Sequence, residues 1–370
     1  MEYYFKTEKM SVGYQGKLLI QNIDIGLNKG EILTLIGPNG AGKSTILKSI
    51  AKQLKLIGGV VYLDKKELAL MSGTELSQRM AVVFTEKMKT ELMTCEDVVA
   101  TGRYPYTGHL GIVSKEDYPL IEQAMELVHV TEIKDRDFTK ISDGQRQRVM
   151  LARAICQEPE IIILDEPTSF LDIKHKLEFL SVLQDLRAQK GLTVIMSIHE
   201  LELAQRVSDR ILCVNGEYVE RFGSPEEVFQ TGYIKSLFGI EIGSFDEENG
   251  SMELEPPCGK PDIFVIAGGG SGRGIYRRLQ RERKAFITGI LFENDLDYPV
   301  ARALAAEFIS VKAFEPVDEA SLQRAYQAIG SCSLVLCCRK KFGSFEDANK
   351  DLLEYAGKIG KTVEMINREE

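Results

Sequence analysis

The chain has 370 residues, of which 44% are hydrophobic and 27% charged, and this length exceeds what one hydrophobic core usually holds, so we expect two domains. Its formal net charge of −9 at pH 7 excludes a broadly basic surface, and we therefore expect no nucleic-acid partner. It contains no apolar run of about 18 residues and begins MEYYFKTEKM, without an apolar signal-peptide core, which predicts a cytoplasmic protein.

The first part of the chain alternates apolar strands with helices. EILTLIG (31–37) is expected to be a buried strand, followed by a glycine-rich loop and a helix over STILKSIAKQL (44–54). EIIILDEP (160–167) and LTVIMSIHE (192–200) are rich in Ile and Val, the pattern of parallel strands buried on both faces. The fold class predicted for this region is therefore α/β.

The loop GPNGAGKST (37–45) matches G-x-x-x-x-G-K-[ST], and it lies between a predicted strand and a predicted helix, as phosphate binding requires. Its backbone N–H groups and the positive helix end can surround phosphate oxygens. Lys43 is expected to reach the β- and γ-phosphates of ATP, and the Ser44 hydroxyl to ligate Mg²⁺. The candidate ATP-binding residues are Gly37, Pro38, Asn39, Gly40, Ala41, Gly42, Lys43, Ser44 and Thr45.

Two adjacent carboxylates end the strand at 160–167. We expect Asp165 to hold the Mg²⁺ shell and Glu166 to polarise the attacking water as general base. The alternative is a solvated acidic pair at the end of a strand.

Between these motifs the run KISDGQRQRVMLARAI resembles the signature of the ABC (ATP-binding cassette) family, which is usually LSGGQ. Here the motif stands as Ile141, Ser142, Asp143, Gly144 and Gln145. The resemblance implies an ATP hydrolase that works as a head-to-tail dimer. Ser142, Gly144 and Gln145 would then contact the ATP held by a second copy of the chain.

The resemblance extends to three more positions. Ser169 to Asp172 is similar to the family's D-loop, and His199 to its switch histidine, which contacts the γ-phosphate as part of the catalytic site. Tyr14 matches the aromatic residue that stacks on adenine, although it could be an ordinary strand tyrosine.

Two positions depart from the family pattern. Thr85, with Glu86 beside it, stands where the family has a glutamine that senses metal and permease, so we treat Glu86 as a candidate metal ligand. Asp143 replaces a glycine, and we expect its carboxylate to cap the following helix.

The details GRYPYTG (102–108), SDGQRQRVMLARA and EPTSFLD resemble the ATPases of importers for iron-siderophores, haem and cobalamin. This implies a position on the inner face of the cell membrane beneath polytopic permease subunits, which residues 85–112 would contact, and an external substrate-binding protein as an indirect partner. Tyr104 and Tyr106 could instead pack a loop. The alternative function is a soluble ABC ATPase of translation or DNA repair, although the chain has one cassette and no sustained heptads.

We expect the ATPase domain to span residues 1–250, a linker 251–261 and a small Rossmann-like α/β domain 262–370, with five strands alternating with helices. The glycine-rich turn GGGSGRG (268–274) and the acidic residues Glu293, Asp295 and Asp297 suggest a regulatory site for a small anionic or nucleotide-like ligand. Dimerisation and partner docking are the alternatives for the domain, and a solvated acidic loop would explain the three acidic residues equally well.

Overall fold

The structure is a computed structural model, and it describes residues 3–84, 92–108 and 111–366. The chain divides into two compact units, residues 1–238 and 239–370. The division falls earlier than the expected end of the ATPase domain at residue 250, so residues 239–250 group with the second unit.

The first unit contains the strands β1 (Phe5–Tyr14), β2 (Lys17–Leu27), β3 (Ile32–Ile36), β4 (Gly58–Leu63), β5 (Lys66–Glu67), β6 (Met80–Val83), β7 (Ile161–Asp165), β8 (Thr193–Ser197), β9 (Arg210–Val214) and β10 (Val219–Gly223). Its helices are α1 (Lys43–Ile50), α2 (Gly73–Arg79), α3 (Cys95–Ala100), α4 (Tyr118–Leu127), α5 (Asp143–Cys156), α6 (Ile173–Lys190), α7 (Leu201–Val207), α8 (Pro225–Val228) and α9 (Tyr233–Leu237). Short 3-10 helices lie at Leu68–Leu70, Thr101–Arg103, Thr131–Ile133 and Phe138–Lys140.

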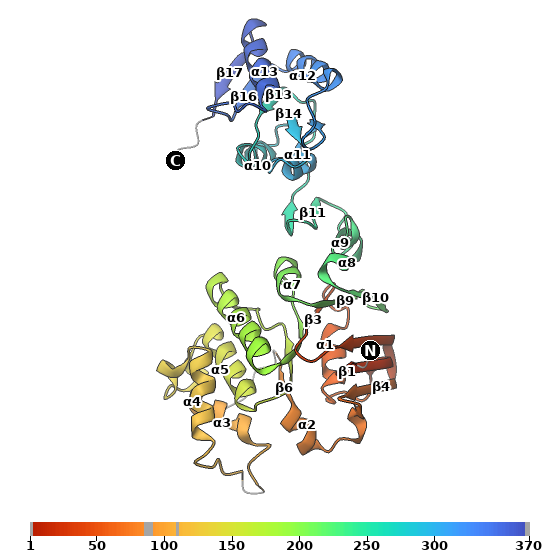
Figure 1. The fold of residues 1–370 in the computed structure, drawn as a ribbon, viewed down its shortest axis with the longest axis vertical. Helices are drawn as coiled ribbons and strands as arrows, with labels where there is room; N and C mark the ends of the chain where they lie inside the picture. The colour runs from red at the N-terminus through yellow and green to blue at the C-terminus, as the bar shows by residue number, and fades with distance from the viewer. Residues whose placement is uncertain (1–2, 85–91, 109–110, 367–370) are drawn as a thin grey trace. The chain divides into compact units, whose positions relative to one another are not determined.

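A six-stranded sheet in the order β10-β9-β3-β8-β7-β6 forms the centre of the first unit (Figure 1). The strands β9, β3, β8, β7 and β6 are parallel, and β10 is antiparallel at the edge. Because β3, β8 and β7 are neighbours, the loops that follow them meet at one edge of the sheet. A second sheet, β2-β1-β4-β5, is antiparallel.

The central sheet has a hydrophobic core on each face. Ile161 and Ile163 of β7 pack in one core with α1, β1 and β2, and Ile162 and Leu164 pack in the other with α3, α4, α5 and α6. This alternation follows from the period of two along a strand. Helices α1 and α5 therefore lie on opposite faces of the central sheet.

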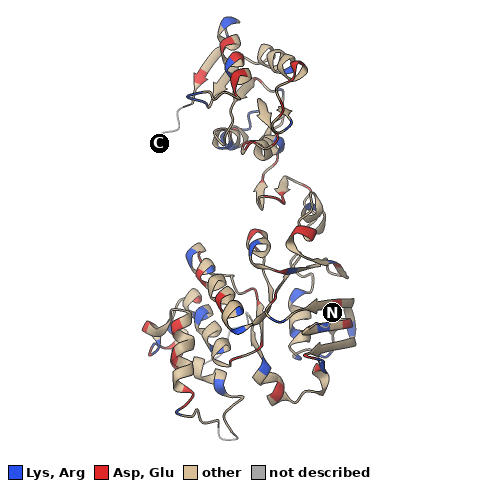
Figure 2. Ribbon diagram, viewed as in Figure 1, with Lys and Arg blue, Asp and Glu red and all other residues tan. Residues whose placement is uncertain are grey.

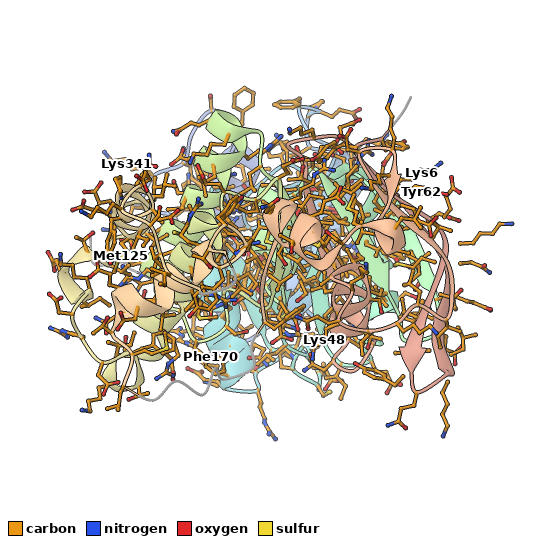
Figure 3. All side chains as sticks on the ribbon, turned by 90° about the horizontal axis from the view of Figure 1, so that it is seen from below. Lys6, Lys48, Tyr62, Met125, Phe170 and Lys341 are labelled. Atoms are coloured by element: carbon orange, nitrogen blue, oxygen red, sulfur yellow. The ribbon has the colours of Figure 1, made fainter. Side chains whose placement is uncertain are left out.

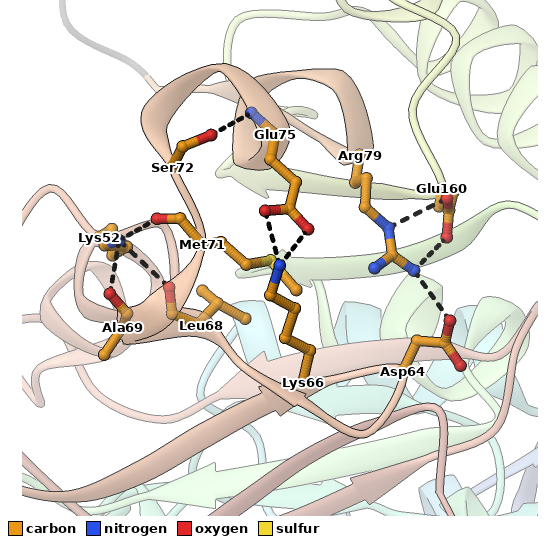
Figure 4. A network of polar contacts seen from close by, with 10 residues as sticks. All are labelled: Lys52, Asp64, Lys66, Leu68, Ala69, Met71, Ser72, Glu75, Arg79 and Glu160. Atoms are coloured by element: carbon orange, nitrogen blue, oxygen red, sulfur yellow. Dashed lines mark hydrogen bonds and ion pairs between the residues drawn. The ribbon is translucent and has the colours of Figure 1, made fainter.

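A polar network joins the antiparallel sheet to the central one (Figure 4). The Arg79 guanidinium on α2 donates to both carboxylate oxygens of Glu160, at 3.1 and 2.9 Å, and lies 3.3 Å from Asp64 Oδ2. Lys66 on β5 binds both oxygens of Glu75, at 2.7 and 2.8 Å. These contacts fix α2 between the two sheets.

The second unit contains the strands β11 (Ser244–Asp246), β12 (Ser251–Glu253), β13 (Ile263–Ile266), β14 (Phe286–Phe292), β15 (Glu307–Val311), β16 (Leu334–Cys337) and β17 (Thr362–Met365). Its helices are α10 (Arg273–Arg281), α11 (Tyr298–Leu304), α12 (Glu319–Ser331) and α13 (Asp347–Lys358).

The five expected strands of the second unit form one parallel sheet in the order β15-β14-β13-β16-β17, with helices between them. The fold class predicted from the sequence is therefore confirmed for both units. The linker prediction was wrong at its start, because Ser251–Glu253 pairs with Ser244–Asp246 as an antiparallel hairpin.

Figure 2 shows basic and acidic residues interspersed along the ribbons of both units. Within the residues that the structure describes, no helix is both long enough and apolar enough to cross a membrane.

Candidate nucleotide-binding site

The phosphate-binding loop follows β3 and turns into α1. Gly37 has a φ of 146°, and a Cβ at this position would lie 2.0 Å from the Val214 carbonyl oxygen of β9. Only glycine fits here, because the backbone is both strained for other residues and in close contact with the neighbouring strand. Within the loop the Ala41 N–H donates to the Pro38 carbonyl at 3.2 Å, and Asn39 and Gly40 are exposed.

Lys43 is the first residue of α1 and is only 5% exposed. Its ammonium donates to the carbonyl oxygens of Gly37 and Pro38, at 2.8 and 2.9 Å, and so lies within the curve of the loop. Burial lowers the pKa of Lys43, and the nearby carboxylates Glu166 and Asp165 oppose that shift. The loop thus holds a positive charge at the place predicted for phosphate.

Asp165 ends β7 and is buried beside the start of α1. Its Oδ1 accepts from the Ser44 hydroxyl at 3.1 Å and from the Ser197 hydroxyl at 2.7 Å. The structure therefore brings the predicted metal ligands Ser44 and Asp165 together, and it adds Ser197 from β8.

Glu166 and His199, the two predicted catalytic residues, lie beside the metal-ligand residues. The His199 Nε2 lies 2.6 Å from Glu166 Oε1, and the Ser169 hydroxyl lies 3.4 Å from Glu166 Oε2. Glu166 has a φ of 50°, a conformation that few non-glycine residues adopt, and its N–H donates to the Ser197 hydroxyl at 3.0 Å. Both predicted catalytic side chains are thus in contact.

Tyr14 lies at the end of β1, and the structure connects it to the loop. The Thr45 hydroxyl on α1 donates to the Tyr14 hydroxyl at 2.9 Å, while the tyrosine side chain is 48% exposed. An exposed ring held beside the phosphate loop can stack on a base. Its adenine contact remains a prediction.

The signature residues lie on α5, across the sheet from the phosphate loop. Ser142 is the N-cap: its hydroxyl accepts from the Gln145 N–H at 3.2 Å, and the Gln145 side chain accepts from the Ser142 N–H at 3.1 Å. The expectation that Asp143 caps the helix was wrong, because Ser142 occupies that position. Asp143 pairs instead with Arg146 at 2.5 Å, and Gly144 lies between them in the first turn.

The D-loop ends where α6 begins. Asp172 is the N-cap of α6 and accepts from the His175 N–H at 2.9 Å. Before it, Phe170 has a φ of 68° and is 80% exposed (Figure 3). Asp172 thus has a structural role in this chain, and its predicted contact with nucleotide stays a prediction.

Four residues of this site were not predicted from the sequence: Ser197, Thr168, Glu200 and Lys176. Ser197 joins Asp165 to the backbone of Glu166, as described above. Glu200 accepts from the Thr168 hydroxyl at 2.9 Å and pairs with Lys176. Although burial raises the pKa of Glu200, these bonds hold it below its ordinary value. These two bonds connect Glu200 to residues on either side of the D-loop. The one sequence signal for these residues was their closeness along the chain to His199 and Glu166.

We expect Ser197→Ala to lower turnover more than its effect on stability explains. Removing the hydroxyl leaves the Glu166 N–H without its partner, which costs about 1–3 kcal/mol. It also removes one of the two hydroxyls that donate to Asp165. A misplaced carboxylate is expected to reduce kcat about tenfold or more. Ser208→Ala is the matched control, since it removes a hydroxyl that donates to Thr34 at 2.6 Å. If both variants lose melting temperature but neither loses kcat, Ser197 has no positioning role.

The expected glutamine-loop position, with Thr85 and Glu86, lies outside the residues that the structure describes. In the adjoining segment, Tyr106 packs against the Arg103 guanidinium, 4.0 Å from the ring centroid, and donates to the Gln157 carbonyl at 3.0 Å. Tyr104 is 57% exposed. Tyr106 therefore does pack its loop, while Tyr104 remains available at the surface.

The glycine-rich turn of the second unit differs from the expected ligand site. The Gly269 N–H donates to Asp295, and the N–H groups of Gly272 and Arg273 donate to Asp297 at 2.9 and 3.0 Å. The amides that would bind an anion are thus bonded to the chain's own carboxylates. Asp297 is fully buried and does not face outward for a ribose. This geometry argues against the nucleotide-like ligand.

A phosphate loop after β3, a lysine within it and two carboxylates at the end of β7, two strands away, define a P-loop nucleoside triphosphatase. The sequence profile of the ABC transporter family matches residues 20–169. A second profile, that of the MJ0874 family, matches residues 286–370.

Similar proteins from other organisms are named as ATP-binding proteins of transporters. The ABC transporter ATP-binding protein MJ0873 of Methanocaldococcus jannaschii is 41% identical over 287 residues, covering 77% of this chain and 99% of that protein. The achromobactin transport ATP-binding protein CbrD of Dickeya dadantii is 35% identical over an alignment that covers 64% of this chain and 87% of that protein. The cobalamin import ATP-binding protein BtuD of Halobacterium salinarum is 29% identical over an alignment that covers 86% of this chain and 81% of that protein.

Solved structures agree with this result. An inward-facing ABC transporter has a TM-score of 0.58 at 27% identity, covering 68% of this chain and 95% of the other. A dimeric ATP-binding cassette, MJ0796, bound to ADP and Pi has a TM-score of 0.53 at 26% identity, covering 60% and 98%. The chain belongs to the ATP-binding proteins of the ABC transporter family and is an ATP hydrolase of that type.

Proposed function

We propose that the protein is the ATP-hydrolysing motor subunit of an importer for iron-siderophore or cobalamin-type cargo. Two copies would bind ATP head to tail on the inner face of the cell membrane, beneath polytopic permease subunits. The observation that carries the mechanism is the contact of Glu166 with His199 beside the phosphate loop. The cargo class is supported by the achromobactin and cobalamin relatives.

The position of the signature helix supports the proposed dimer. Helices α1 and α5 pack in different cores on opposite faces of the central sheet, so one chain cannot close both around the same phosphate. The Ser142 hydroxyl accepts from Gln145 and keeps its hydrogen to donate to a phosphate oxygen. A second copy, facing the first, would supply that donor and the positive end of α5.

A mixture of two inactive variants tests this arrangement. Lys43→Ala and Ser142→Arg should each abolish most turnover alone, because each damages both sites of its homodimer. In a mixed dimer one site has an intact Lys43 and an intact Ser142 from different chains, so turnover should recover to about a quarter of wild type. Phosphate release is the readout, and a mixture no more active than its components would contradict the head-to-tail arrangement.

The donor set near Lys43 suits Mg²⁺. Ser44 and Asp165 offer hard oxygen ligands that already lie 3.1 Å apart, and the described residues contain no cluster of three His, Cys, Asp or Glu side chains that could hold a metal alone. This fits an ion bound through one carboxylate, one hydroxyl, water and substrate phosphates. When bound, Mg²⁺ neutralises charge that develops on the phosphates.

The remaining steps belong to the chain's own residues. Lys43 would bind the β- and γ-phosphates, with its charge brought close by the curve of the loop. Glu166 would accept a proton from the attacking water, and His199, 2.6 Å from Glu166 Oε1, would orient that carboxylate and contact the γ-phosphate. The Ser197 hydroxyl fixes the backbone of Glu166.

The permease would bind at residues 85–112, of which the structure describes 92–108 and 111–112. Leu92 is 97% exposed, and Tyr104 and Ile112 are 57% and 69% exposed, which gives this region apolar side chains for a partner helix. The test is to purify tagged Glu166→Gln protein with ATP from detergent-solubilised native membranes and to identify the bound proteins by mass spectrometry. A stoichiometric polytopic protein supports the importer, whereas ribosomal or repair proteins alone would support the soluble alternative.

A further inference from the structure

The match to a second family profile begins inside one folded domain of this chain. The MJ0874 family profile begins at Phe286, the first residue of β14. The relative MJ0873, by contrast, aligns over 77% of the 370 residues and is itself almost fully covered, so about 85 residues here have no counterpart in it. An alignment of about 285 consecutive residues must include residues 86–285, whether it begins at residue 1 or as late as residue 86. The alignment with MJ0873 therefore includes β13 and α10.

Strand β13 lies in the middle of the sheet that this boundary cuts. It pairs with β14 on one side and with β16 on the other, and both neighbours follow residue 285. Phe264 and Ile266 pack in the core of one face, and Val265 in the core of the other. In the described part of the chain before residue 286, β13 has no partner strand. Two open apolar edges would aggregate unless another protein covered them.

Helix α10 depends on the same partner residues. The Tyr276 ring stacks on Phe286 with centroids 5.2 Å apart, and its hydroxyl lies 2.7 Å from that of Thr288. The N–H groups of Gly272 and Arg273, at the start of the helix, are bonded to the Asp297 carboxylate. An isolated β13–α10 unit would lose both of these bonds and the packing of Tyr276, and the N–H groups at the helix start would be left to water.

We propose that β13 and α10 (263–281) form a docking element for a second protein subunit. Its partner has the chemistry of residues 286–370: a four-stranded parallel α/β piece with a gap between β14 and β16 that β13 fills. In this chain the docking element and its partner are fused, and the covalent link at residues 282–285 is not needed for their association.

The test expresses the whole chain as two polypeptides in one cell, residues 1–285 with an affinity tag and residues 286–370 without one. We expect the tagged polypeptide to purify with the other at a one-to-one ratio. Phe264→Asp places a charge in the buried face of β13 and should reduce capture at least tenfold, whereas Arg281→Ala on the exposed side of α10 should leave it unchanged. ATP binding by the 1–285 polypeptide verifies that the cassette is folded, independently of any transport function.

Cutting the chain at a second position distinguishes a specific docking interface from the general tendency of protein fragments to reassemble. Cutting the chain between Ala305 and Ala306 also divides the sheet at a turn, after α11, where the MJ0874 family profile has no boundary. We expect the pieces 1–305 and 306–370 to give at least tenfold less complex. Equal assembly at both cuts would overturn the proposal, and so would a 1–285 polypeptide that binds ATP but fails to capture residues 286–370.

Discussion

Glu166→Gln is expected to reduce ATP turnover by about 10²- to 10⁴-fold, the range attributed to a general base, while ATP still binds. Glutamine keeps the size of the side chain and can still hydrogen-bond to His199, which lies 2.6 Å from Glu166 Oε1. It cannot accept a proton from water at neutral pH. Because binding is retained and hydrolysis is not, the ATP-bound dimer should accumulate.

Steady-state phosphate release and size-exclusion chromatography with and without ATP measure these two effects. Glu202→Gln is the matched control, because Glu202 is a carboxylate of α7 that pairs at the surface with Arg206, 2.8 Å away. The control should turn over ATP normally and should not accumulate as a dimer. Normal turnover in the Glu166 variant would mean that another group removes the proton.

The sequence predicted the nucleotide site well because its motifs are local. The glycine loop, Lys43 and Ser44 come from one continuous run, and EIIILDEP marks both a buried strand and its two carboxylates. Ser197 was not predicted, because its role depends on β8 lying between β3 and β7 in the sheet. Strand order is a tertiary property that no single segment encodes.

The differences between the sequence-based expectations and the structure have related causes. Ser142 and Asp143 are both good N-cap residues, and the sequence alone does not say which one occupies the cap. The acidic residues after β14 were assigned to a ligand on the basis of spacing, yet Asp295 and Asp297 bind the glycine loop's own amides. The proline-rich composition of 251–261 correctly indicated irregular chain after residue 253 but concealed the short strand before it.

Lys43→Ala is expected to weaken ATP binding by about ten- to a hundredfold, since hydrogen bonds to charged groups contribute about 1.5–3 kcal/mol. The ammonium already lies within the loop, bonded to the Gly37 and Pro38 carbonyls, so little rearrangement is needed for it to meet phosphate. Lys48→Ala, on the same helix with its ammonium 5.7 Å from the centroid of the Phe84 ring, is the control (Figure 3). Calorimetric titration with a non-hydrolysable ATP analogue measures both variants. Equal ATP affinities for the two variants would show that Lys43 does not bind the phosphates.

The same residue gives ATP affinity a predictable pH dependence. Burial lowers the pKa of Lys43 below its ordinary value of 10.5, against the opposing effect of Glu166 and Asp165. As pH rises through that lowered pKa, the free protein loses the ammonium charge, and binding of ATP must then restore the proton at increasing cost. Affinity should therefore begin to fall at a lower pH than an ordinary lysine would allow. Lys43→Arg keeps its charge throughout this range, so its affinity, although weaker, should stay constant with pH. A parallel decline in both proteins would show that the pH effect arises from another group.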